Sequence, residues 1–295
     1  MQKNKFDIKK DFIKLKNNKG KSIAKIDLKR GGTLQDLILN GVKVIEQKNY
    51  FNYSDSFASS ILFPFVNRLK GGIYFFKNKS YQLPINEIGG NAHHGLVFDK
   101  RFILDNYELI ESDAVINLSY ESKGEEGYPF PFKIEIEYVI GFDFMNLNVK
   151  ITNLSNRDIP YSIGWHPYFV SSDLFKSSVQ FNKSHDIVSD DLGVANHRLR
   201  SNGLVNINPG NDRLDNCFQL KSNEIKFSTP NYLLSLSCDC DPIFLQIYNP
   251  PFKDLFAIEL TSGISNSLNN KIGLDVLEQY KSRKISWKLS IIPNE

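Results

Sequence analysis

The two residues best suited to carry out chemistry in this sequence are a histidine and a glutamate, each in apolar surroundings. His166 lies in the aromatic segment Gly164–Phe169, and Glu259 is the only charge in the stretch Leu255–Leu260. Burial raises the pKa of a carboxyl group towards the range of a general base, and a desolvated imidazole with a pKa near neutrality can donate a proton. The aromatic rings beside His166 are of the kind on which sugar faces rest. Either group could instead be structural, the histidine as a hydrogen-bonded core residue and the glutamate in a buried ion pair.

Two further segments offer groups suited to binding. Asn67 and Arg68 follow an apolar run. The planar guanidinium of an arginine beside aromatic residues is suited to binding vicinal hydroxyl groups. The same pattern is also typical of a strand that ends with an arginine at the rim of the fold. His93 and His94 lie between glycines, which let a backbone come close to a ligand. Because adjacent residues of a strand face opposite ways, we expect at most one of these histidines to point into a given pocket, which disfavours a metal site.

Several classes of function are excluded by what the sequence lacks. It contains no phosphate-binding loop, dinucleotide fingerprint, zinc-protease motif or nucleophile elbow. The three cysteines, Cys217, Cys238 and Cys240, are odd in number, and the Cys-Asp-Cys spacing is not that of a zinc knuckle. We therefore expect a reaction that needs no cofactor and no metal.

Charge and hydropathy limit the classes of binding partner that the sequence favours. The 295 residues carry 36 basic and 33 acidic side chains, and the basic excess lies in residues 1–20, which hold seven lysines and two aspartates. These lysines alternate with apolar residues and no arginine accompanies them, so a solvated or frayed first strand is favoured over an arm that binds nucleic acid. The sequence has no apolar stretch of about 18 residues and no signal-peptide pattern. We expect a cytoplasmic protein that binds neither nucleic acid nor a membrane.

The elements that must position these groups are β-strands. Apolar and polar residues alternate, as in half-buried strands, over Ile116–Tyr120, Ile134–Tyr138, Leu147–Ile151 and Ile285–Ile291. So many alternating strands must bury one face against a second layer. The pattern predicts an all-β fold, a large antiparallel β-sandwich, in one domain over residues 1–295.

Turn residues agree with this fold. Asn40-Gly41 between apolar runs predicts a two-residue hairpin turn, and Lys77-Asn78-Lys79 a slightly longer one. The polar stretch 184–211, with His185 and His197, lacks alternation, and we expect it to form long loops at the rim.

The order and spacing of the four polar segments resemble those of the aldose 1-epimerases, or mutarotases. The matching segments are Leu62–Pro64 with Asn67 and Arg68, Asn91–Gly95, Asn153 with Pro160 and Gly164–Phe169, and Glu259. The resemblance extends from about residue 22 to residue 292. It implies a large β-sandwich with an open cleft, in agreement with the strand pattern, and an isomerase that interconverts the α and β anomers of a free aldohexose.

The resemblance also implies roles. Glu259 would be the general base, His166 the general acid, and His94 a contact near the ring oxygen of the sugar that supports catalysis. This chain departs from the family pattern in having His93, where many members have leucine, and in lacking a proline beside the glutamate.

The remaining roles concern the sugar hydroxyls. By the same resemblance Arg68 would hold them, with Asn67 beside it. The aspartate that binds hydroxyls in the family matches Asp215, with Asp212 as a competitor. We expect a small-molecule sugar as the only partner and either a monomer or a homodimer.

Two other functions fit the same residues. A hexose-6-phosphate mutarotase would need a basic cluster at the mouth of the cleft, for which the sequence offers Arg101, Arg198, Arg200 and Lys70. A non-catalytic carbohydrate-binding protein would keep the aromatic residues and the arginine, but it would not need an apolar-flanked glutamate together with a buried histidine.

Overall fold

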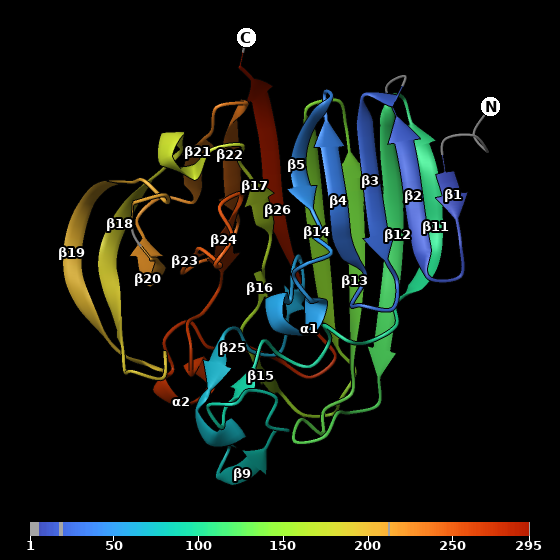
Figure 1. The fold of residues 1–295 in the computed structure, drawn as a ribbon. Coiled ribbons are helices and arrows are strands. Elements are labelled where there is room, and N and C mark those ends of the chain that lie inside the picture. The colour runs from blue at the N-terminus through green and yellow to red at the C-terminus, as the bar shows by residue number, and fades with distance from the viewer. Residues whose placement is uncertain (1–5, 18–19, 212, 295) are drawn as a thin grey trace.

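The computed structural model of the protein describes residues 6–17, 20–211 and 213–294, in which a continuous 20-stranded antiparallel sheet is folded into two stacked layers (Figure 1). The prediction of an all-β sandwich is confirmed. One layer contains, in order of pairing, β1 (Phe6–Ile8), β2 (Phe12–Asn17), β3 (Ser22–Asp27), β4 (Thr33–Leu39), β5 (Val42–Glu46), β17 (Tyr168–Val170), β24 (Leu255–Thr261), β23 (Phe244–Tyr248) and β20 (Asp215–Leu220). β16 (Gly164–Trp165) pairs with both β24 and β6 (Ile61–Leu62).

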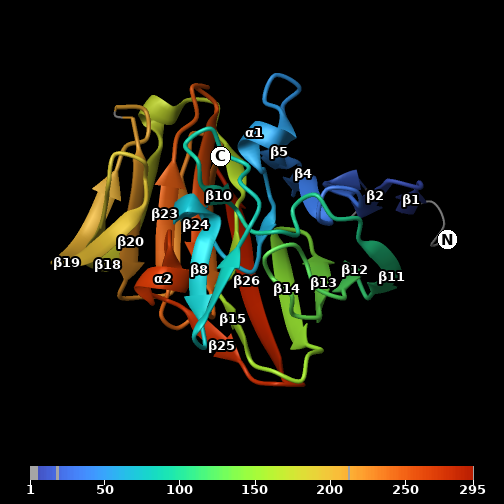
Figure 2. The same ribbon diagram turned by 90° about the horizontal axis from the view of Figure 1, so that it is seen from below.

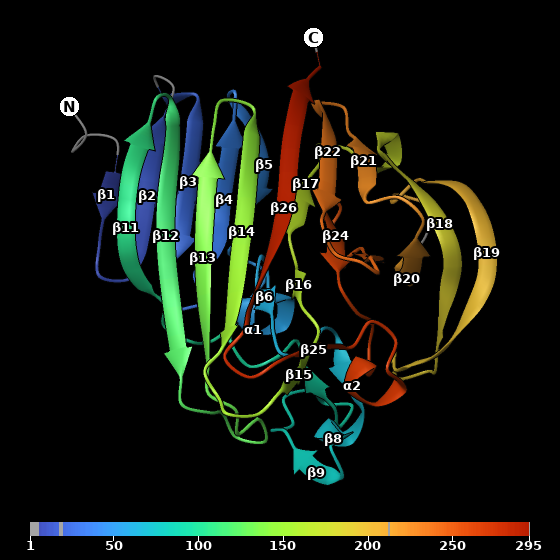
Figure 3. The ribbon, with the colours of Figure 1, turned by 180° about the vertical axis from the view of Figure 1, so that it is seen from behind.

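The second layer, seen in Figure 3, contains the four strands with the clearest alternation in the sequence. In order of pairing it consists of β11 (Ile103–Ile110), β12 (Asp113–Ser122), β13 (Phe132–Ile140), β14 (Phe144–Asn153), β26 (Ser282–Pro293), β22 (Tyr232–Cys238) and β21 (Glu224–Ser228). Their apolar faces form the core between the layers. Trp287 of β26 is fully buried there, and its indole N–H donates to the carbonyl oxygen of Leu260 in β24 at 2.8 Å, which links the two layers.

Two predicted hairpin turns are present. Asn40 and Gly41 join β4 to β5 with φ values of 47° and 79°, the left-handed conformations that such a turn needs. β8 (Ile73–Phe76) and β9 (Lys79–Gln82) are joined by Lys77 and Asn78 alone. The longer turn expected there is wrong, because both of these residues take left-handed φ values, 48° and 60°, and the pairing resumes at once.

The prediction of loops over 184–211 is wrong. This stretch belongs to a long hairpin of β18 (Ser178–Ser189) and β19 (Ala195–Ile207), so His185 and His197 lie in strands. Its sequence does not alternate because most side chains of β19 are exposed, so no apolar face is needed. Backbone hydrogen bonds hold the hairpin, and these leave no trace in a hydropathy pattern.

The hairpin also closes the sandwich along one side. The start of β18 pairs with β21 of one layer, and residues 183–187 pair with β20 of the other layer. Near the N-terminus, the prediction of a strand with a solvated face is confirmed within residues 6–17. Ile13 and Leu15 of β2 are buried, while Lys14 and Lys16 alternate with them and face the solvent. Residues 1–5 lie outside the described residues.

Short elements cover one end of the sandwich, the end that faces the viewer in Figure 2. They are β7 (Arg68–Leu69) paired with β10 (Ala92–His93), the β8–β9 hairpin, β15 (Ile159–Tyr161) paired with β25 (Asp275–Leu277), α1 (Tyr53–Ser56) and α2 (Ser267–Asn270). Within the ranges given above, no helix has both the length and the apolar composition needed to cross a bilayer.

Candidate active site

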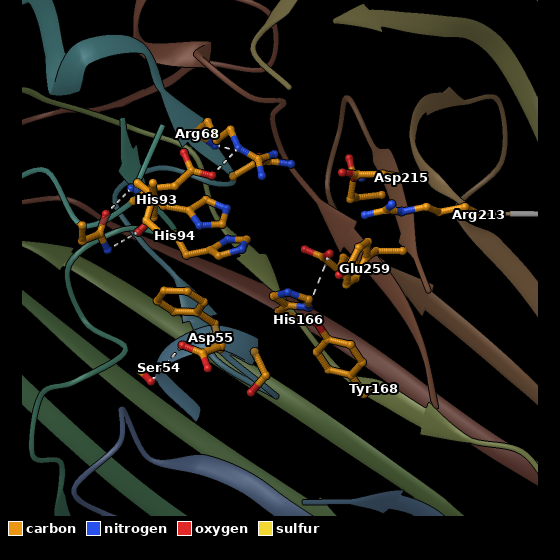
Figure 4. Close-up of a pocket in the computed structure, with 18 residues that line it drawn as sticks. Ser54, Asp55, Arg68, His93, His94, His166, Tyr168, Arg213, Asp215 and Glu259 are labelled. Atoms are coloured by element: carbon orange, nitrogen blue, oxygen red, sulfur yellow. Dashed lines mark hydrogen bonds and ion pairs between the residues drawn. The ribbon is translucent and has the colours of Figure 1, made fainter. Parts of the chain in front are cut away.

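Strand pairing places the predicted acid opposite the predicted base. β16 and β17 both pair with β24, and one register relates Gly164 to Thr261 and Tyr168 to Ala257. Continuing that register sets His166 directly across from Glu259. The imidazole Nδ1 lies 3.4 Å from Oε1 of the carboxyl group, and both side chains are about 5% exposed or less (Figure 4).

Burial favours the neutral form of both groups. It raises the pKa of Glu259 well above the ordinary value, with a further increase from the nearby charge of Asp215 and an opposing effect of Arg68. It lowers the pKa of His166 to about 3, with a smaller contribution from His93. The expectation of an imidazole pKa near neutrality is therefore wrong for His166. The two atoms are not aligned as a hydrogen bond, so the buried Nδ1 has no hydrogen-bond partner among the described residues.

The two-stranded β7–β10 sheet joins the Asn67–Arg68 segment to the His93–His94 segment. Arg68 and His93 are directly paired in it, and the amide N–H of His94 donates to the carbonyl oxygen of Asn67 at 2.9 Å. The ring of His94 lies 4.9 Å from that of His166, centroid to centroid. The segments predicted to bind the ligand are thereby brought next to the predicted acid and base.

Both adjacent histidines face the same pocket, so the expectation that at most one could do so is wrong. His94 has a left-handed φ of 60°, which breaks strand alternation and stacks its ring on that of His93 at 3.7 Å. Gly95 follows with φ 79°, and a β-carbon there would lie 2.3 Å from the carbonyl oxygen of Phe63, so only glycine permits this turn. Burial lowers the pKa of both histidines, that of His93 to about 3.

Arg68 is held from two sides. Its Nε donates to the Glu87 carboxylate at 2.7 Å, and its Nη1 donates to the Asn67 side-chain oxygen at 3.3 Å. On the other side lies Gly193, in the turn of the β18–β19 hairpin, where a β-carbon would come within 2.6 Å of Nη1. The guanidinium is thus fixed between a carboxylate and a close-packed backbone.

Asp215 enters from the opposite wall of the pocket, at the start of β20 (Figure 4). Its carboxylate accepts a hydrogen bond from Gln246 at 2.8 Å, and Gln246 is the direct partner of Glu259 in the β23–β24 pair. The surrounding strands raise the pKa of Asp215 by burial, although its side chain still faces the open pocket, and Arg68 and Arg213 oppose that increase. Its competitor, Asp212, lies outside the described residues.

All six predicted site residues line one cavity of about 390 Å³. Sequence reasoning missed other residues in its wall: Glu87, Arg213, Gln246 and Tyr248, together with Ser54–Phe57 around α1. Gln246 carried a detectable signal, since it is a lone polar residue in an apolar run, as Glu259 is. The aromatic platform is smaller than expected, because Trp165 and Phe169 are buried in the core and Tyr168 alone of that segment's rings lines the cavity.

A family model for aldose 1-epimerases matches residues 11–281. The chain belongs to the aldose 1-epimerase family. Its sequence is 23% identical over 274 residues to the uncharacterized protein YihR of Escherichia coli K12, covering 88% of this chain and 87% of that protein.

Solved structures of other proteins have the same fold as this chain. A galactose mutarotase-like protein from Clostridium acetobutylicum superposes with a TM-score of 0.86 at 20% identity, covering 98% of each chain. The galactose 1-epimerase of Lactobacillus acidophilus NCFM gives a TM-score of 0.78 at 17% identity, covering 99% of this chain and 98% of that one. The predicted resemblance to the aldose 1-epimerases is confirmed at the level of family and fold.

The described walls of the cavity in this aldose 1-epimerase family member include neither a metal-binding cluster nor the basic residues that the sequence offered for a phosphate. No group of three or more His, Cys, Asp or Glu side chains is arranged to hold a metal ion among the described residues. None of the basic residues proposed from sequence for a phosphate lines the cavity: Arg101, Arg198, Arg200 and Lys70. Arg101 instead pairs with Asp11, and Arg198 donates to the Gln219 side chain at 3.0 Å.

The packing of Gly193 against Arg68 gives a first prediction. Gly193→Ala should raise KM for a sugar about tenfold with little change in kcat, because the new methyl group displaces the guanidinium and weakens a charge-assisted hydrogen bond. Gly41→Ala is the matched control, since Gly41 has a similar φ of 79° but open space around its β-carbon position. Steady-state kinetics of both variants checks this. An equal rise of KM in the two would show that backbone strain, and not the arginine, is responsible.

Proposed function

We propose that the protein is an isomerase that interconverts the α and β anomers of a free aldohexose by acid–base catalysis. The observation that carries the proposal is the buried pair of His166 and Glu259, 3.4 Å apart in the wall of a polar cavity. A sugar-binding protein without activity would have no use for two ionisable groups in the core, since burying them costs stability.

The proposed reaction needs one carboxylate and one protonated imidazole. Glu259 takes the proton of the C1 hydroxyl, the C1 carbonyl forms as the bond from C1 to the ring oxygen breaks, and His166 gives its proton to that oxygen. After rotation about the C1–C2 bond, the imidazole takes the proton back, the oxygen attacks the other face of C1, and the carboxyl group returns its proton. No electrons or atoms are gained or lost, so the proposed chemistry calls for neither a cofactor nor a covalent intermediate.

Burial favours the arrangement in which the single proton of this pair lies on the carboxyl group, because it raises the pKa of Glu259 and lowers that of His166. Catalysis starts from the other placement of the same single proton, with the imidazole charged. The net charge of the pair is zero in both arrangements, but the transfer turns two neutral groups into a buried ion pair, and the attraction between charges 3.4 Å apart offsets part of the desolvation cost.

The charges of the cavity favour a neutral sugar over a phosphorylated one. Its walls carry two arginines, Arg68 and Arg213, against the carboxylates of Asp55, Glu87 and Asp215 and the carboxyl group of Glu259, which burial favours in its neutral form. One of the arginines is already paired, at 2.7 Å from Glu87. A phosphate would enter against this excess of carboxyl groups, whereas sugar hydroxyls can donate hydrogen bonds to them.

Polarimetry of freshly dissolved sugars tests the proposal. Added protein should accelerate mutarotation of α-D-glucose or α-D-galactose well above the spontaneous rate, and glucose 6-phosphate should compete weakly. Heat-denatured protein at equal concentration is the control. Sugar binding by calorimetry without any acceleration would instead favour the carbohydrate-binding protein.

The pKa shifts predict an unusual pH dependence. The pair keeps a single proton between the pKa of His166, about 3, and the raised pKa of Glu259. We therefore expect kcat/KM to stay level between about pH 4.5 and 6.5, where an exposed glutamate and histidine would titrate, and to fall only at higher pH as the pair loses its proton. Polarimetry over pH 4–9, with the spontaneous rate subtracted at each pH, measures the profile. A bell-shaped profile with apparent pKa values of about 4.5 and 6.5 would show that the two groups titrate as exposed side chains do. That result would contradict the proposal that the buried pair shares one proton.

A further inference from the structure

The imidazole of His166 must carry a charge in the proposed reaction, although its surroundings disfavour that charge. Its side chain is about 5% exposed, and burial lowers its pKa to about 3. A buried charge is costly unless other groups attract it. Glu259, with its Oε1 at 3.4 Å from Nδ1, supplies one such attraction at the edge of the ring. A second group on the face of the ring would lower the cost further.

Tyr168 covers a face of this imidazole. The two ring centroids are 5.0 Å apart, and the ring planes differ by 26°, so the rings are stacked (Figure 4). Residues two apart in an extended chain point to the same side of a sheet, which explains why the segment between β16 and β17 places these rings together. Among the described residues Tyr168 is the one ring stacked on His166, because the ring of His94 is tilted by 50°.

The Tyr168 ring is itself held in place. Its side chain is buried, and its backbone pairs with Ala257, two residues before Glu259 in β24. The ring of Phe51 meets it edge-on, at 5.5 Å and 83°, and Phe252 packs on Phe51 at 5.0 Å. These contacts hold Tyr168 against the imidazole, so they also fix the plane of the acid.

The stacking favours the charged form of the imidazole. The face of an aromatic ring is negative and attracts a cation that lies within about 6 Å of the ring centroid. Burial, and after it the charge of Glu259, raise the pKa of the Tyr168 hydroxyl group, so the ring stays an uncharged phenol. The attraction is stronger for an imidazolium than for a neutral imidazole. It therefore favours the arrangement of the shared proton from which the proposed reaction starts.

We infer that Tyr168 is a positioning residue that acts through His166: its ring fixes the plane of the imidazole and stabilises the imidazolium that gives a proton to the ring oxygen. This inference rests on the proposed function. It differs from the role predicted for the aromatic residues from the sequence, in which their faces support the sugar, because here the ring acts on the acid.

The test compares Tyr168→Leu with Tyr168→Phe by steady-state polarimetry. Phenylalanine keeps the ring face, so kcat should stay within about threefold of the native value. Leucine removes it, so kcat should fall about tenfold while KM stays within about threefold. A tenfold loss corresponds to about 1.4 kcal/mol, which is in the range of cation–π interactions at desolvated sites. Tyr107→Leu is the control, since Tyr107 packs on Phe6 in β1 and does not line the cavity.

Three results of this comparison would overturn the inference. A raised KM with native kcat in Tyr168→Leu would assign the ring to the sugar. Equal losses of kcat in the two variants would assign the effect to the hydroxyl group. Native constants in Tyr168→Leu would leave the ring without a role. If the native protein accelerates no sugar, the proposed function itself is overturned, and this result is distinct from the other three.

Fluorinated phenylalanines at position 168 separate charge from packing, and they do not require the leucine variant to fold. Each added fluorine withdraws electron density from the ring face and changes the size of the ring little. With 4-fluoro-, 3,5-difluoro- and pentafluorophenylalanine, kcat should fall stepwise, to about a tenth of the Tyr168→Phe value at the end of the series. Equal kcat across the series, in variants with the same Tm, would overturn the stabilisation of the imidazolium by Tyr168.

Discussion

Glu259→Gln should lower kcat for mutarotation by about a thousandfold, within the range of roughly 10² to 10⁴ that general base catalysis contributes. Glutamine keeps the shape and the hydrogen-bonding capacity of the protonated carboxyl group, but it cannot take a proton from the C1 hydroxyl. Polarimetry with saturating α-D-glucose measures the change. Glu224→Gln, at an exposed position of β21, is the control and should keep full activity.

The same variant has a second readout in its stability. The pKa of Glu259 is raised in the folded state by burial, so above the pKa of the unfolded chain, about 4.5, unfolding releases a proton. The favourable contribution of the protonated group is therefore present at low pH and lost as pH rises through the folded pKa. Tm of Glu259→Gln should exceed that of the native protein at pH 8 but not at pH 4. Retained activity together with unchanged stability would show that Glu259 is neither the base nor an ionisable core group.

His166→Asn should lower kcat at least a hundredfold and change KM much less. Asparagine can hold a hydrogen bond to the ring oxygen, but it cannot deliver a proton in the transition state, so the loss appears in the chemical step. His185→Asn, which removes a histidine of β18 outside the cavity, should leave both constants unchanged. A rise in KM with kcat preserved would assign His166 to binding alone.

Much of the framework could be predicted from the sequence because it depends on alternation and on turn residues. The strands β12, β13, β14 and β26 carry one buried face, so hydropathy reports them directly. The β18–β19 hairpin has no such face over most of its length, so its hydropathy pattern predicts loops. Its existence depends on backbone pairing, and the packing of its turn on Arg68 could not be derived from composition.

The candidate site residues also include some that the hydropathy pattern reveals and others that it does not. Glu259 and His166 stand out because a polar residue among apolar ones is visible in the sequence. The shared orientation of His93 and His94 was not visible, because it depends on one left-handed backbone conformation at His94 and on the close approach of Gly95 to Phe63. Arg213 and Glu87 gave no signal, since a charged residue in a polar segment is the ordinary case.

The register that places His166 across from Glu259 has a consequence for how sugar preference can change. Their separation is a dimension of the paired β16, β17 and β24 strands, so it is insulated from changes in loops. The hemiacetal group that this pair would act on is the same in every aldose. Under the proposed function, discrimination between sugars would fall to residues outside that ladder, such as Arg68 and Asp215. We therefore expect substitutions at these positions to change sugar preference while the separation of His166 and Glu259 stays the same.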